Sequence, residues 1–196
     1  WWLRFPGCEE KGRPARAPFI LFMVHCWLIS DTHFGHEKAC TFLRPDGEKL
    51  RPFDNAEEAD EAMVEKWNAV VKPKDRIYHL GDVAIPRRGL KVLERLNGRK
   101  VLVRGNHDIY KLSDYAQYFD DVRGCFYHHE FMLSHIPLHP ELFEQRFRGN
   151  IHGHLHCHNV RLPDGSLDRR YFNTCVEQNN FAPFHWDEAM AYFDGE

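Results

Sequence analysis

The chain has 196 residues, of which 43% are hydrophobic and 28% charged, and its 26 basic and 29 acidic side chains give a net charge of −3. This is the composition of a globular protein long enough to bury its own core, and the chain contains no internal repeats or low-complexity segments. The near balance of charge excludes a strong general attraction to nucleic acid or to a membrane surface.

Residues 1–22 are predicted to form an extension outside the fold, non-native or disordered, with a single domain over residues 23–196. The chain begins without methionine. The apolar run 19–29 lacks the small-residue cleavage site of a signal peptide, so we interpret that run as a core strand. No span approaches the roughly 20 apolar residues needed to cross a membrane. The six cysteines are scattered without a C-x-x-C pair, which indicates reduced thiols and a cytoplasmic protein.

Strand-like and helix-like segments alternate beyond residue 23. Asn55 and Glu58 form the start signal of a helix that Pro73 ends, and a second helix is predicted over 88–96. The order of these segments predicts an α/β fold with a parallel sheet, followed by antiparallel hairpins made of shorter strands. The strands are expected at residues 24–30, 76–80, 100–104, 131–135, 149–152 and 171–176.

Metal-seeking side chains follow five of these predicted strands directly. Ligands of open α/β sheets bind beyond the carboxyl ends of the strands, so these side chains are expected to meet at one edge. The candidates, in chain order, are Asp31, His33, Asp82, Asn106, His135, His154 and His156.

The types of these side chains indicate which ion they hold. Imidazole, carboxylate and amide groups without a thiolate favour manganese, iron, zinc or nickel over a structural zinc site, and we expect manganese first. Seven ligands are too many for one ion that keeps an open position, whereas two ions about 3.5–4 Å apart that share a carboxylate would use them all. Asp82 is the candidate for the shared carboxylate, because its strand is central in the expected sheet.

The motifs D-x-H, G-D, G-N-H-D, a lone His and G-H-x-H occur in this order over residues 30–156. This pattern resembles the calcineurin-like metallophosphoesterase superfamily, and segments such as "WLISDTHFGH" resemble its small single-domain bacterial and phage members. The resemblance implies a four-layer α/β/β/α sandwich of two mixed sheets with two metal ions. It implies that one ion is held by Asp31, His33 and His156, the other by Asn106, His135 and His154, and that Asp82 bridges them.

The resemblance also implies a dinuclear phosphoester hydrolase in which a metal-bridging hydroxide attacks, His107 lies near the leaving group and Asp108 orients His107. "GDVAIPR" and "GNHD" depart from the G-D-x-V-D-R-G and G-N-H-E of protein phosphatases, and no basic stripe suits a long nucleic acid. Small cyclic or linear nucleotide-type phosphodiesters are therefore the expected substrates. The alternatives are a phosphomonoesterase or protein phosphatase of the same superfamily, and a non-catalytic metal-binding scaffold.

Three further residues are candidates for substrate contacts. His36 lies in the first motif loop, Arg104 directly precedes the "GNHD" motif, and Arg44 lies in loop 40–53, which can overhang the rim. A solvated side chain or an ion pair is the competing interpretation. His79 and His152 are expected to form hydrogen bonds beneath the site rather than to bind substrate.

Overall fold

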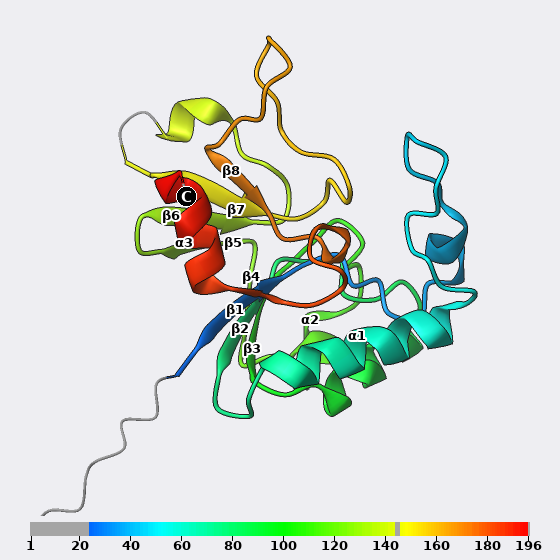
Figure 1. The fold of residues 1–196 in the computed structure, drawn as a ribbon. Helices are drawn as coiled ribbons and strands as arrows, with labels where there is room; N and C mark the ends of the chain where they lie inside the picture. The colour runs from blue at the N-terminus through cyan, green and yellow to red at the C-terminus, as the bar shows by residue number, and fades with distance from the viewer. Residues whose placement is uncertain (1–23, 144–145, 196) are drawn as a thin grey trace, which may run out of the picture.

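The computed structural model describes residues 24–143 and 146–195, so the prediction for residues 1–22 lies outside the described part of the chain. The described residues form a mixed α/β fold with two mixed sheets (Figure 1). In the first sheet, four strands are parallel and the short edge strand β9 is antiparallel to β1. Its order is β4 (Asp121–Arg123), β3 (Arg99–Val103), β2 (Arg76–His79), β1 (Cys26–Ile29) and β9 (Phe184–His185).

The second sheet has the order β5 (Cys125–His128), β6 (Phe131–Ser134), β7 (Gly149–His152) and β8 (Tyr171–Asn173). The expected antiparallel hairpin occurs between β5 and β6, but the expectation is wrong for the later strands, because β6, β7 and β8 are parallel. The segments that connect β6 to β7 and β7 to β8 each return to the edge of the sheet where the strands begin, as parallel pairing requires. The carboxyl ends of β6 and β7 therefore lie at the same edge.

The helix α1 (Ala56–Val70) begins as predicted, since the side chain of Asn55 accepts a hydrogen bond from the Glu58 N–H at 2.9 Å. The second predicted helix is a 3₁₀ helix, η2 (Arg87–Arg95), because an apolar pattern does not separate the two kinds of helical turn. No helix in the described ranges is long and apolar enough to span a membrane. The other helical segments are η1 (Glu37–Thr41), α2 (Leu112–Tyr115), η3 (Pro140–Phe143), η4 (Val176–Gln178) and α3 (Trp186–Asp194).

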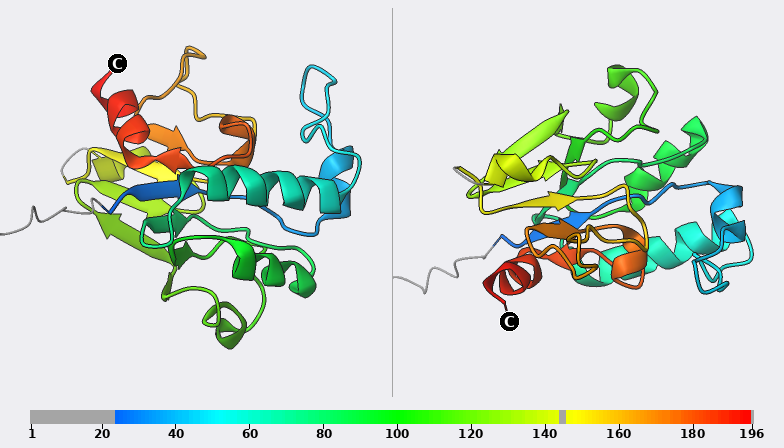
Figure 2. Two further views of the ribbon diagram at one scale, coloured as in Figure 1. Left: turned by 60° about the horizontal axis from the view of Figure 1, so that its bottom comes forward. Right: turned by 90° about the horizontal axis from the view of Figure 1, so that it is seen from above.

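Two hydrophobic layers lie on the two faces of the first sheet. Ile29 and Ile77 pack towards α1 and η2, whereas their neighbours Leu28 and Tyr78 pack towards the second sheet, as alternation along a strand dictates. Helix α1 and the second sheet lie on opposite sides of the first sheet (Figures 1 and 2). Helix α3 contributes Ala189 to the layer between the sheets. This layer packs the two sheets against one another.

Candidate metal centre

The structure brings the seven predicted ligands together in two adjacent groups. Ligand atoms within 4.8 Å of one another define the group Asp31, His33 and His156 and the group Asp82, His135 and His154. Asn106 joins the second group, because its Oδ1 lies 2.8 Å from Nε2 of His135. The members follow β1, β2, β3, β6 and β7, so both sheets contribute to the centre.

Asp82 lies between the two groups. Its Oδ2 is 3.8 Å from Nε2 of His33 and 3.4 Å from Nε2 of His135, while its Oδ1 accepts a hydrogen bond from the backbone N–H of His107 at 2.8 Å. Burial alone would raise the pKa of Asp82, but His135, the His107 N–H and the charge of His33 together lower that pKa to about 2. One ionised carboxylate oxygen thus faces both groups.

The donor atoms around Asp31 fit a divalent cation. Asp31 Oδ2 accepts hydrogen bonds from the His154 N–H at 2.8 Å and from the Cys175 thiol at 3.1 Å. Its Oδ1 is buried without a hydrogen-bond partner in the described structure and lies 3.8 Å from Nε2 of His33 and 3.9 Å from Nε2 of His156. These distances are too long for hydrogen bonds, but two atoms that each lie about 2.1 Å from one ion can be up to about 4.2 Å apart.

Several of the ligand-bearing residues have a left-handed backbone, which is uncommon for residues other than glycine but several-fold enriched for Asp, Asn and His. This conformation turns the chain sharply just after β1, β2 and β7 and directs successive side chains towards the same space. The residues are Asp31 (φ 57°), His33 (φ 48°), Asp82 (φ 57°), His154 (φ 70°) and His156 (φ 50°).

A buried ion pair that the sequence did not reveal supports the first group. Arg51 donates to the carbonyl oxygens of Thr32 at 2.7 Å and Asp31 at 2.6 Å, and its Nε donates to Glu177 Oε1 at 2.9 Å. Glu177 Oε2 lies 3.2 Å from Nδ1 of His156. The side chains of Arg51 and Glu177 are only 2% and 0% exposed. Although burial would raise the pKa of Glu177, the charge of Arg51 and the His156 contact hold it below its usual range.

The G-N-H-D loop places an exposed His107 beside the first group, with its ring centre 5.6 Å from that of His33. The sequence led us to expect that Asp108 orients the His107 ring. In the structure both Asp108 carboxylate oxygens instead accept bonds from backbone N–H groups, those of Asp82, Val83 and Gly105, at 2.8–3.0 Å. Asp108 therefore positions the loop that carries His107 relative to the loop that carries Asp82.

Of the three predicted substrate contacts, His36 is the one that lies at the centre, with its ring 5.8 Å from that of His33. Burial and then the charge of Arg51 lower the pKa of His36, which favours a neutral imidazole at the rim. The Arg104 guanidinium donates to the carbonyl oxygens of Asp108 and Tyr110 instead. Arg44 forms backbone hydrogen bonds with Gly47 and Glu48 in a turn, so neither of these two described arginines bonds to the predicted ligands.

His79 and His152 lie beneath the centre, as expected. Nδ1 of His79 accepts a bond from the Gly81 N–H at 3.2 Å, and its Nε2 lies 2.9 Å from the hydroxyl of Thr32. Nδ1 of His152 lies 2.7 Å from the carbonyl oxygen of Gly153. Complete burial lowers the pKa of His79 to about 3, so this ring is neutral. It forms hydrogen bonds that hold the loops carrying the candidate ligands.

The fold and the centre together define a mixed α/β protein with two neighbouring histidine–carboxylate groups at a common sheet edge. No protein-family model matches the chain. The "Uncharacterized protein MJ1445" of Methanocaldococcus jannaschii is 34% identical over 175 residues, which cover 84% of this chain and 89% of the archaeal protein. The chain belongs to the same family as this archaeal protein.

Two further proteins are similar to the chain. The "Gene 66 protein" of Mycobacterium phage L5 is 31% identical over 91 residues, which cover 44% of this chain and 41% of the phage protein. The crystal structure of the protein of unknown function AQ665 from Aquifex aeolicus superposes with a TM-score of 0.63 and 27% identity, over 85% of this chain and 97% of that chain. The bacterial protein thus shares this fold along nearly the whole of its own chain.

Proposed function

We propose that this chain is a metal-dependent phosphoester hydrolase of the calcineurin-like type. The observation that carries the proposal is the position of Asp82 Oδ2, which faces His33 at 3.8 Å and His135 at 3.4 Å. A single carboxylate oxygen between two sets of nitrogen and oxygen donors is the arrangement that a two-ion site needs. The stacking of helices and two mixed sheets is compatible with the four-layer α/β/β/α sandwich of that superfamily.

Asp82 lies between two sets of residues, each of which would hold one divalent ion. Asp31, His33 and His156 would bind one, and Asn106, His135 and His154 the other, with manganese as the proposed ion and iron, zinc or nickel as alternatives. Two such ions, when bound, supply positive charge for the phosphoryl oxygens and acidify a coordinated water.

The chain's own residues contribute position and proton transfer. The exposed ring of His107 lies at the rim, where it can hydrogen-bond or protonate the oxygen of the leaving alcohol. His36 lies on the same rim, where its neutral imidazole can form a hydrogen bond with a phosphoryl oxygen or with a water molecule bound to that oxygen. Arg51 and Glu177 hold the loop of Asp31 and the ring of His156 in place without facing the substrate.

We expect the metal-stripped protein refilled with manganese to hydrolyse bis-(p-nitrophenyl) phosphate faster than p-nitrophenyl phosphate, with no turnover before refilling. The measurement is the release of p-nitrophenolate from each substrate, with metal content determined on the same samples. Preference for the diester supports a phosphodiesterase for small nucleotide-type substrates, whereas preference for the monoester supports a phosphatase. Two bound ions without turnover of either substrate would favour a non-catalytic scaffold.

His107→Ala is expected to lower the rate of hydrolysis by roughly 10²–10⁴-fold, as the loss of a positioned acid–base group does. The backbone N–H of residue 107 still donates to Asp82 Oδ1 in this variant, so the metal content should stay at the parent level. Steady-state rates and metal analysis check the two parts separately. Parent-level turnover with both ions bound would contradict the role of His107.

A further inference from the structure

A cavity of about 330 Å³ opens beside the second group of candidate ligands. Two of its lining residues, Asn106 and His135, belong to that group. The other walls come from the loop after β3, the turn between β4 and β5, and the segment after β6. The cavity is therefore directly beside the place where a molecule bound to these two candidate ligands would lie.

The cavity walls offer apolar surface and few free polar groups. Ile136, directly after His135, is 51% exposed, and Leu138 is half-buried next to it. The Ser134 hydroxyl donates to the Ile136 carbonyl oxygen at 2.7 Å, and the Arg104 guanidinium lies on backbone carbonyl oxygens and over the Tyr115 ring. The lining also includes Cys125, a free thiol that is only weakly polar. Among the described residues, no carboxylate side chain lines the cavity.

The shape of the cavity favours a compact group. Its volume is at the low end of the range of about 300–1,000 Å³ for small-molecule sites. Gly124 forms part of the wall and brings the backbone close without a side chain, which suits a flat ligand, whereas a Cβ atom at Gly105 would meet Asp82 Oδ1. A Cβ atom added at Gly124 would meet no atom within 4 Å, so this position is open towards a larger residue.

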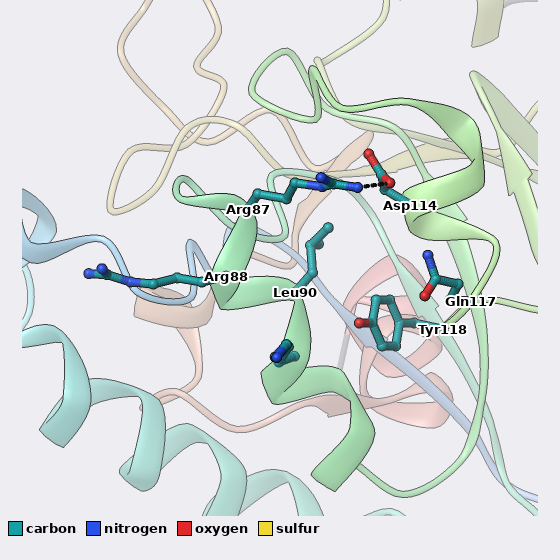
Figure 3. Close-up of a pocket in the computed structure, with 7 residues that line it drawn as sticks. Arg87, Arg88, Leu90, Asp114, Gln117 and Tyr118 are labelled. Carbon is teal, nitrogen blue, oxygen red and sulfur yellow. Dashed lines mark hydrogen bonds and ion pairs between the residues drawn. The ribbon is translucent and has the colours of Figure 1, made fainter.

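A second cavity of similar volume serves as a comparison (Figure 3). It lies between η2 and the segment 112–118 and contains none of the candidate ligands. Arg87 is paired with Asp114 there, and Gln117 and Tyr118 lie on the far wall (Figure 3). Most of its lining residues are charged, in contrast to the apolar walls beside Asn106 and His135.

We propose that the cavity of Ile136, Leu138 and Gly124 binds the organic group of the phosphoester and selects a compact, uncharged, aromatic one such as a nucleobase or a phenyl ring. This inference rests on the proposed function, because the ions would hold the phosphoryl group next to Asn106 and His135. Contact with Ile136 and Leu138 then stabilises the aromatic group by removing apolar surface from water.

The test compares the binding of phenylphosphonate and methylphosphonate, two non-hydrolysable probes, to the manganese-loaded full chain by isothermal titration calorimetry. We expect phenylphosphonate to bind about tenfold more tightly, the order of discrimination that apolar pockets achieve. Gly124→Leu, which fills the cavity, and Ile136→Ser, which removes its apolar wall, should each reduce this preference to within about twofold, with methylphosphonate binding unchanged. Gln117→Trp, in the comparison cavity, should leave the preference as it is.

The outcomes separate this inference from the function on which it rests. Equal binding of the two phosphonates by the parent protein, or a preference that survives both Gly124→Leu and Ile136→Ser, would overturn the cavity assignment and leave the hydrolase proposal standing. If neither phosphonate binds although manganese is present at two ions per chain, the proposed function fails and the cavity assignment fails with it.

Discussion

Replacing Asp82 with asparagine is expected to lower the hydrolysis of bis-(p-nitrophenyl) phosphate by at least about 10³-fold. The loss of one hydrogen-bond donor to a transition state already costs about 10²–10³ in rate, and Asp82 would serve two ions at once. Asparagine keeps the oxygen that accepts from the His107 N–H but removes the negative charge that faces His33 and His135. The variant should therefore bind fewer than two ions while its fold is retained.

Metal stoichiometry, steady-state rates and the midpoint of thermal unfolding should be measured together for Asp82→Asn. Asp164→Asn is the matched control, because Asp164 is an exposed aspartate that accepts hydrogen bonds from Ser166 in a surface turn. The control should keep the parent rate and both ions. A folded Asp82→Asn protein with two ions and the parent rate would contradict the assignment of a shared carboxylate.

The substitution Glu177→Ala is expected to lower the free energy of unfolding of the metal-free protein by about 3–5 kcal/mol, since it leaves the buried guanidinium of Arg51 without its counter-ion. In a chain of this size the thermal midpoint should fall by roughly 10 °C. Measuring the metal-free form excludes stabilisation by bound ions. Because Glu177 also contacts Nδ1 of His156, the refilled variant should lose affinity for one ion more than for the other.

An exposed ion pair provides the control for Glu177→Ala. Glu61 pairs with Arg95 through two close contacts, but their side chains are 54% and 49% exposed. Glu61→Ala should therefore change the free energy of unfolding by no more than about 1 kcal/mol. Equal losses in the two variants, measured by denaturant unfolding, would show that the buried pair contributes no more than the exposed one.

Features of the fold that depend on residues close together in the sequence could be predicted. The helix start at Asn55 and the six expected strands are present, with strand ends that differ by up to three residues. The short strands β4, β5 and β9 were not predicted, because their residues are exposed or only partly buried and so leave no buried apolar run in the sequence. Helix α3 was also missed, although its capping Glu188 and terminal Gly195 are recognisable signals; its cap is a histidine, which is not a usual capping residue.

The sequence predicted the candidate ligands of the centre but not the residues that hold these ligands in place. The ligands stand directly after strands, where position along the chain fixes position at the sheet edge, and the parallel β6 and β7 bring His135 next to His154. Arg51 and Glu177 meet across 126 residues of sequence, and no local pattern indicates such a pair. The direction of the Asp108 carboxylate was unpredictable for the same reason, because its partners come from the loop of Asp82.

The left-handed backbone of the ligand loops implies a trade-off between stability and activity. A non-glycine residue held in this conformation can cost on the order of 1 kcal/mol, and five candidate ligands, Asp31, His33, Asp82, His154 and His156, adopt it. Glycine would accept the same conformation more readily but would supply no ligand. Selection for thermal stability alone would thus favour sequences that lose the centre, whereas selection for activity has to keep these loops and the buried network that restrains them.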